Sequence, residues 1–391
     1  MAISFGIIMI LGLLANKVFT KLKLPGLLGM LMIGILLGPY AFNILDKDIL
    51  IISGDLRKIA LIVILLRAGL GVKKETLKKI GIPAIKLSFI PGIFEGFTLI
   101  FITMKVFNFS FEQAGILAFI IAAVSPAVVV PSMLNLIERG KGEKKAIPTL
   151  ILAGASIDDV FAITIYSTFL GMYSAKNRDI FRQLLNIPIS ILLGILVGVI
   201  IGLIMTYIFK HYHIRDTKKT LILLSTAIIF NSLESPLEKI IPIATLLGVM
   251  TIGFILLEKY PAVANRLSDK FNKVWVLAEI ILFVLVGAEV NIFVAIDSGL
   301  IGILVIAIGL IGRSIGVIIS LIGTNLNLKE KLFCIIAYTP KATVQAAIGA
   351  VPLSMSVEGG ELILAMAVLS IIITAPLGAI GIKFAGERYL K

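Results

Sequence analysis

The sequence is poor in the residues that build soluble enzymes, metal clusters and disulfide scaffolds. Of its 391 residues only 15% are charged, and there are one cysteine and two histidines. The lone cysteine, Cys334, excludes an internal disulfide and a cluster of thiolate metal ligands. Soluble domains carry about 25% charged residues, so this chain lacks the polar surface that a soluble fold of its length needs.

The chain is instead rich in apolar residues, which occur in long unbroken runs. Hydrophobic residues make up 59% of the sequence, and the mean hydropathy is +1.08. A membrane β-barrel would alternate apolar and polar residues, whereas these runs are continuous. The composition therefore predicts an all-α polytopic membrane protein, and it excludes an ordinary globular enzyme, a disordered chain and a secreted scaffold.

Apolar runs long enough to cross a bilayer, roughly 17–25 residues each, recur along the chain. We predict about 13 transmembrane helices, near residues 3–20, 24–42, 56–72, 82–107, 112–137, 147–175, 184–209, 219–232, 239–257, 271–289, 298–323, 330–351 and 360–384. Basic residues follow the first run instead of preceding it, unlike in a cleaved signal peptide. We therefore expect this run to be a first span with its N-terminus outside.

The charges of the connections predict the orientation. In the N-out, C-in arrangement, the connections on the cytoplasmic side carry about three times as many lysines and arginines as those outside. This bias also accounts for the net charge of +13 without a nucleic-acid partner. His211 and His213 lie in one of the basic inner connections. We expect a solvated loop there, with a pH sensor as the alternative.

Two spans combine a hydroxyl residue with a proline near mid-membrane: Ser125-Pro126 in the fifth and Thr339-Pro340 in the twelfth. These spans are seven apart, and an odd offset reverses orientation, so a repeat that relates them would be inverted, as in many secondary transporters. Because proline interrupts a helix, the pair predicts two broken helices that cross at a central site and present helix termini to it. Two unrelated proline kinks are the alternative.

Five ionisable residues lie near the middle of predicted spans: Glu95, Asp158, Asp159, Arg313 and Lys341. Such a residue costs about 2.5–3.5 kcal/mol on the insertion scale and is a functional candidate by default. If the four spans that carry them converge, they form a polar site without a metal motif. The spans of Glu95 and Arg313 would be counterparts in the repeat, which predicts a buried ion pair with a structural or a tuning role. Lys341 would neutralise a carboxylate such as Asp158.

The adjacent carboxylates Asp158 and Asp159 are the sharpest signal. Neighbouring residues point about 100° apart on a helix, so one can face a cavity while the other faces a partner helix. Burial and repulsion between like charges both favour the protonated form of a carboxylate. Such a group can hold either a proton or a small cation, and competition between the two makes the simplest exchanger. The alternative is a structural ion pair with Arg313 or Lys341.

At these residues the chain resembles a known superfamily. Residues 125–131, 147–149 and 156–159 closely resemble motifs of the monovalent cation:proton antiporters, and within them the sodium/proton exchangers of the NHA type, in the double-aspartate branch. Residues 67–70 and 340–347 also look like that subgroup. The motifs run from the third to the twelfth predicted span, so the resemblance covers most of the chain.

The resemblance implies a homodimer in the cell membrane that works by elevator-type alternating access. It implies a core domain containing the two crossed helices, which would comprise residues 82–175 and 298–384, and dimer or scaffold helices in 1–72 and 184–289. No cofactor is implied beyond the transported Na⁺ or Li⁺ and H⁺.

The resemblance also implies that Asp159 is the main cation and proton site, with Asp158 beside it. Many electrogenic relatives have a lysine where Arg313 stands, and arginine stays charged at any relevant pH, so the stoichiometry is left open. The full set of residues expected at the site comprises the ion ligands Asp159, Asp158 and Ser125, the supporting charges Lys341, Arg313 and Glu95, and the unwound residues Pro126, Thr339 and Pro340.

Other functions remain as alternatives to Na⁺/H⁺ exchange. A transporter of K⁺ or of an organic anion on the same fold is the main one, since Arg313 and Lys341 would attract an anion. An intramembrane aspartyl protease needs two aspartates that face each other across two helices, whereas these are neighbours on one. No Gly-x-Ser-x-Gly occurs with a membrane histidine, and no pore-loop filter sequence appears.

Overall fold

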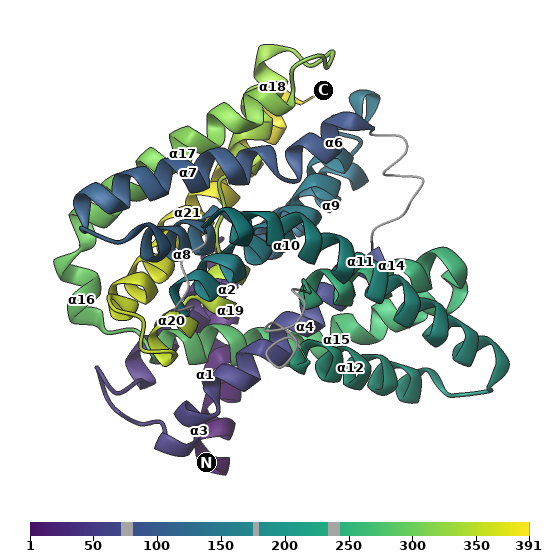
Figure 1. The fold of residues 1–391 in the computed structure, drawn as a ribbon, viewed down its shortest axis with the longest axis horizontal. Coiled ribbons are helices and arrows are strands. Elements are labelled where there is room, and N and C mark those ends of the chain that lie inside the picture. Colours follow the sequence, from purple (N-terminus) through teal and green to yellow (C-terminus); the bar gives the residue numbers. More distant parts are fainter. Residues whose placement is uncertain (72–80, 175–179, 234–242, 391) are drawn as a thin grey trace. The chain divides into compact units, whose positions relative to one another are not determined.

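The computed structural model describes residues 1–71, 81–174, 180–233 and 243–390, and every regular element in these ranges is a helix (Figure 1). A helix satisfies its own backbone hydrogen bonds, which a lipid environment requires. The all-α prediction is therefore confirmed for this part of the chain. Some of the basic residues used to predict the orientation, those of 73–79 together with Lys176, Arg178 and Lys239, lie outside the described residues.

Eight helical segments within the described residues are long and apolar enough to cross a membrane. They are α1 (Ala2–Lys21), α6 with α7 (Ile82–Leu87 and Ile90–Val106), α8 with α9 (Phe111–Ala122 and Pro126–Glu138), α10 (Ile147–Ser174), α11 (Ile180–His211), α15 (Pro261–Ala288), α17 (Gly299–Ser320) and α21 (Gly360–Tyr389). This confirms a protein with many membrane spans. The count of about 13 stays a prediction.

The other predicted spans correspond to shorter, more polar or interrupted helices. The remaining elements are α2 (Gly26–Leu37), α3 (Lys47–Ile51), α4 (Ser53–Gly71), η1 (Glu143–Lys145), α12 (Asp216–Ser232), α14 (Thr245–Lys259), α16 (Ile292–Asp297), α18 (Leu328–Ala337), α19 (Thr343–Ile348) and α20 (Val351–Ser354). Hydropathy predicts one span through 330–351, and the chain leaves the helix between α18 and α19, where the Thr339-Pro340 pair predicts a break. Hydropathy alone does not reveal such an interruption.

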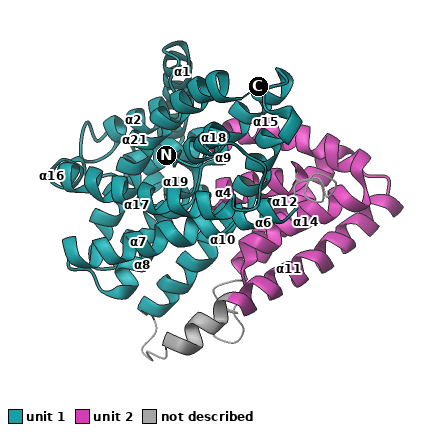
Figure 2. Cartoon of the chain, turned by 90° about the horizontal axis from the view of Figure 1, so that it is seen from above, with its two compact units in different colours: residues 1–57, 80–173, 280–391 teal, residues 58–79, 174–279 magenta. Residues whose placement is uncertain are grey.

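The chain divides into two compact units, coloured separately in Figure 2. Unit 1 comprises Met1–Arg57, Ile80–Tyr173 and Ile280–Lys391, and unit 2 comprises Lys58–Lys79 and Ser174–Glu279. In unit 1, α7 packs against α8 and α17, while α19 packs against α8 and α21. In unit 2, α14 packs against α11 and α12.

The two interrupted helices of unit 1, α8 with α9 and α18 with α19, both begin with a capping box. At the start of α8, the Ser110 side chain accepts from the backbone N–H of Gln113, and the Gln113 side chain accepts from the Ser110 N–H. Asn327 and Glu330 form the corresponding capping box at the start of α18. These reciprocal bonds satisfy backbone donors that a helix start leaves free, so the sequence fixes where both helices begin.

Glycines allow two close helix crossings, one in each unit. In unit 1, Gly34 of α2 faces the backbone of Val284 and Gly287 in α15. In unit 2, Gly69 of α4 faces the backbone of Met250 and Gly253 in α14. Small residues are typical of such contacts in membrane proteins. An offset of seven spans relates α2 to α14 and α4 to α15, so the two crossings correspond as an inverted repeat requires.

The Gly34 crossing generates a stability prediction. A Cβ at Gly34 would overlap the carbonyl oxygen of Val284, which is backbone and cannot rotate away. We expect Gly34→Ala to lower the free energy of unfolding by about 1–3 kcal/mol, measured as a lower midpoint of thermal unfolding in detergent. Gly6→Ala in α1 is the matched control, because nothing lies within 4 Å of the added Cβ. Equal midpoints for the two variants would contradict the close crossing.

Candidate functional site

The site forms where the two interrupted helices of unit 1 meet. Helix α8 ends at Ala122 and α9 begins at Pro126, while α18 ends at Ala337 and α19 begins at Thr343. The two interruptions are in direct contact, because the backbone N–H of Ser125 donates to the carbonyl oxygen of Pro340 at 2.8 Å. The predicted unwound residues Pro126, Thr339 and Pro340 therefore lie at or within these interruptions.

Polar side chains satisfy the backbone groups that the first interruption exposes. Gln345, in the first turn of α19, donates from Nε2 to three carbonyl oxygens, those of Ile120, Ile121 and Ala123, at 2.9, 3.2 and 3.0 Å. Asp158 of α10 accepts from the backbone N–H of Val124 at 2.9 Å. In a dry interior these bonds replace the lost helix bonds, so they hold the broken segment in one conformation.

One carboxylate oxygen joins both buried bases. Glu95 Oε2, on α7, accepts from Arg313 Nη1 of α17 and from Lys341 Nζ, each at 2.6 Å. Arg313 Nη2 also donates to Asp158 Oδ2 at 2.9 Å. Arg313 and Lys341 both donate to the carbonyl oxygen of Ala122 as well. All four charged side chains are buried.

The predicted ion pair between Glu95 and Arg313 is therefore present, whereas Lys341 has a different partner from the one expected. Lys341 bonds to Glu95 and not to Asp158. Arg313 supplies the positive charge beside Asp158 instead, donating to its Oδ2 together with the backbone N–H of Val124. The Lys341 backbone N–H donates to Thr374 Oγ1 of α21 at 2.8 Å, which fixes where its side chain starts.

Asp159 differs from the other charged residues of the cluster because it takes part in no ion pair within the described residues, although only 5% of the residue is exposed. Thr343, at the start of α19, lies beside it. Within the described part of the chain, buried oxygens without a hydrogen-bond partner occur at Asp159 Oδ1, Asp158 Oδ1, Glu95 Oε1, Ser125 Oγ and Thr343 Oγ1. Leaving such an atom unsatisfied costs about 1–3 kcal/mol, so this group of oxygens is suited to bonding with a ligand or with water.

The charges of the cluster do not balance. Glu95, Asp158 and Asp159 are acidic, while only Arg313 and Lys341 are basic. Both bases are bonded to Glu95 or Asp158, so the excess negative charge belongs to Asp159. A buried charge without a partner is strongly unfavourable. One proton or one monovalent cation at Asp159 would neutralise the cluster, and carboxylate and hydroxyl oxygens are the ligands that hard cations prefer.

Sequence reasoning assigned no role to two residues that complete the site. Gln345 stands in the motif 340–347 quoted for the resemblance, and Tyr338 directly precedes the Thr339-Pro340 pair. Only the structure places Gln345 against the interruption and the Tyr338 ring 5.4 Å from Arg313 Cζ. A Cβ at Gly154 would overlap the Tyr338 hydroxyl, which explains a glycine one turn before Asp158. For Gln345, the available sequence signal was the presence of a glutamine inside an apolar run.

Glu95 generates a prediction about stability. Glu95→Gln leaves Lys341 without a carboxylate in a dry interior, so we expect a loss of about 3–5 kcal/mol in unfolding free energy. Adding Lys341→Gln removes the unpaired positive charge, and the double variant is expected to be more stable than Glu95→Gln alone. Thermal unfolding of both variants and of Lys341→Gln gives the coupling between the pair. Additive losses would contradict the pairing.

Comparison with known proteins gives a consistent result. A family model described as "Sodium/hydrogen exchanger, transmembrane" matches residues 6–387. Sodium/hydrogen exchanger 9B2 of Homo sapiens is 33% identical, over 98% of this chain and 72% of that protein. The 9B2 protein of Bison bison bison is 36% identical, over 99% and 75%. Sodium/hydrogen exchanger 9B1 of Homo sapiens is 30% identical, over 94% and 73%.

The fold also matches a solved structure. The sodium proton antiporter MjNhaP1 from Methanocaldococcus jannaschii, at pH 8, superposes with a TM-score of 0.87 and covers 98% of this chain and 97% of that one. The two sequences are 20% identical, so this likeness concerns the fold alone.

Proposed function

This chain belongs to the sodium/hydrogen exchanger family, and on that premise we propose that it exchanges Na⁺ or Li⁺ for H⁺ across a membrane. The family assignment confirms the superfamily recognised from the motifs and identifies the chain as a transporter and not an enzyme. One observation carries the proposal. The buried cluster has one excess negative charge, at Asp159, whose Oδ1 has no hydrogen-bond partner among the described residues.

In the proposed mechanism, Asp159 holds one positive charge at a time. When it is ionised, it binds the cation together with Asp158 Oδ1 and Ser125 Oγ, which have no hydrogen-bond partner within the described residues. When it takes a proton, the cluster is already neutral, so the cation is released. Arg313 stays charged throughout and holds Asp158 in place, and is therefore a positioning residue and not a proton carrier.

Transport also requires that the site open to each side in turn. We propose that the helices of residues 82–175 and 298–384 move as a core against those of 1–72 and 184–289, in elevator fashion. The inverted repeat of about 13 spans with an N-out, C-in orientation, the homodimer and the location in the cell membrane belong to the same proposal. The corresponding crossings at Gly34 and Gly69 support the repeat.

The alternative of anion transport loses its main support. It rested on Arg313 and Lys341 as binding groups, but both donate to Glu95, and Arg313 also donates to Asp158. Bases that are paired with carboxylates offer an anion little attraction.

Transport of K⁺ stays an alternative, because carboxylate and hydroxyl oxygens suit both Na⁺ and K⁺. The size of the cage of oxygens around the ion decides between the two.

Asp159→Asn tests the proposal. In proteoliposomes with an imposed pH gradient, we expect Na⁺ or Li⁺ to dissipate the gradient with the wild type. With the variant, which cannot ionise, we expect no cation-dependent dissipation. Asp297→Asn is the matched control, since Asp297 is an exposed acid at the end of α16 and should leave exchange unchanged.

Each outcome of this experiment decides something. Exchange that survives in folded Asp159→Asn contradicts the assignment of the site. Dissipation by K⁺ and not by Na⁺ or Li⁺ supports the alternative cation. No response to any of the three from folded wild-type protein would contradict cation/proton exchange itself.

A further inference from the structure

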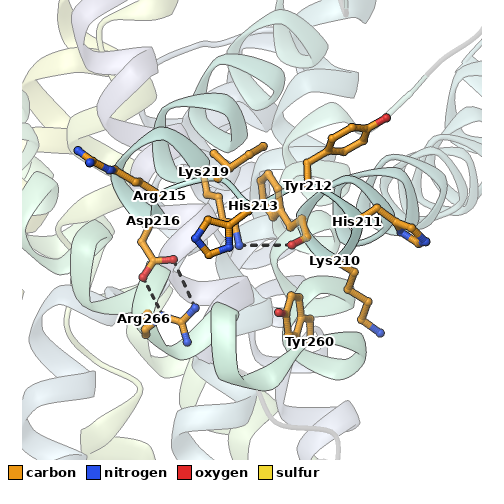
Figure 3. Close-up of a pocket in the computed structure, with 11 residues that line it drawn as sticks. Lys210, His211, Tyr212, His213, Arg215, Asp216, Lys219, Tyr260 and Arg266 are labelled. Atoms are coloured by element: carbon orange, nitrogen blue, oxygen red, sulfur yellow. Dashed lines mark hydrogen bonds and ion pairs between the residues drawn. The ribbon is translucent and has the colours of Figure 1, made fainter.

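A second polar site lies in unit 2, away from the acidic cluster in sequence and in chemistry. A pocket of about 520 Å³ opens where α11 ends and α12 begins, and the start of α15 completes its wall. Basic side chains dominate its lining: Lys210, Arg215, Lys219 and Arg266, against a single acid, Asp216. Figure 3 shows His213, Lys219 and Tyr260 grouped at its centre, while Arg215 points away from them.

One basic residue of the pocket is already neutralised. Arg266 donates from Nε to Asp216 Oδ2 at 2.7 Å and from Nη2 to Oδ1 at 3.4 Å (Figure 3). These hydrogen bonds hold the pKa of the Asp216 carboxyl below its usual range, so the acid is ionised at neutral pH. The pair therefore contributes no net charge, and the positive charge of the pocket comes from Lys210, Lys219 and Arg215.

Lys219 is the central lysine, and its ammonium has few hydrogen-bond partners within the described residues. Only 5% of the residue is exposed, and the one hydrogen bond that its ammonium makes within the described residues goes to the carbonyl oxygen of Phe209, at 3.3 Å. Its ammonium lies 5.8 Å from the centroid of the Tyr260 ring, and that of Lys210 lies 5.5 Å from the same centroid. An ammonium carries three donors, so Lys219 has donors left for an anion beside Tyr260.

The position of the pocket indicates which kind of anion it binds. Residues Pro188–His211 of α11 are apolar enough to span a membrane, so the pocket lies at the end of a span, at the depth of lipid headgroups. Ile200, Leu203, Ile204 and Tyr207 are exposed and follow one another at helical spacing toward the pocket. An acyl chain along this stripe would end beside His211, whose ring packs against Tyr207 and which lines the pocket. Basic pockets of this kind, on the side predicted to be cytoplasmic, suit acidic headgroups.

We propose that this pocket binds the phosphate of an anionic phospholipid, with Lys219 as its main ligand and Lys210 at its rim. Tyr260 closes the pocket below the two ammonium groups, and its hydroxyl is a further donor. Ile200, Leu203 and Ile204 contact the acyl chain. The site does not depend on the exchange activity, since it shares no residue with the acidic cluster.

The test is thermal unfolding of the purified full chain in detergent, titrated with phosphatidylglycerol, with phosphatidylcholine, and with inorganic phosphate. We expect phosphatidylglycerol to raise the midpoint by a few degrees more than phosphatidylcholine, as a ligand that binds the folded state does. Lys219→Gln loses a charge-assisted hydrogen bond to phosphate, so we expect the half-saturating concentration to rise about tenfold. Lys210 lies at the rim, so Lys210→Gln removes no buried lysine. We expect this variant to show a smaller rise in the half-saturating concentration.

Lys144→Gln is the matched control, because Lys144 is an exposed lysine of the predicted cytoplasmic side outside the pocket. We expect it to respond to phosphatidylglycerol as the wild type does. Equal stabilisation by the two lipids, or an equal loss of response in Lys144→Gln and Lys210→Gln, would overturn the proposal. The same midpoint shift with inorganic phosphate alone would assign the pocket to a free phosphate and overturn the lipid as its source.

Discussion

The shared carboxylate oxygen of Glu95 is the interaction on which the site depends. Arg313 and Lys341 both donate to it, so two positive charges from α17 and from the start of α19 are held at one point of α7. Arg313 has donors left for Asp158, and this third contact brings α10 to the same point. Both bases are thus paired with Glu95 or Asp158, and Asp159 takes part in no ion pair within the described residues. The proposed capacity to bind a proton or a cation follows from that imbalance.

The interrupted helices supply the second requirement, which is a set of backbone groups outside regular helix beside the carboxylates. A continuous helix offers no free carbonyl or N–H to its surroundings, whereas the segment before α9 offers several. Gln345 and Asp158 hold those groups in place, and the hydrogen bond from Ser125 to Pro340 ties the two interruptions together. The polar residues thus act on the backbone as well as on the ion. Losing one of them would disturb the geometry of the whole crossing.

Sequence reasoning predicted the parts of this protein that local chemistry determines. Unbroken apolar runs predicted helices, and charges misplaced in those runs predicted Glu95, Asp158, Asp159, Arg313 and Lys341 as one group. Lys341 does neutralise a carboxylate, but that of Glu95 and not the suggested Asp158, because which acid each base reaches is a property of the folded site. The basic pocket was read as an ordinary inner loop, since charge counts do not show that Lys219 is buried.

The most direct test of the central claim counts protons released when a cation binds. Calorimetric titration of purified protein with Na⁺, in buffers of different ionisation enthalpy, measures that number without transport. If Asp159 holds either a proton or a cation, about one proton is released per Na⁺ bound in moderately acidic buffer, and the number falls toward zero as the pH rises. Binding of Na⁺ that releases no proton at any pH would contradict the account.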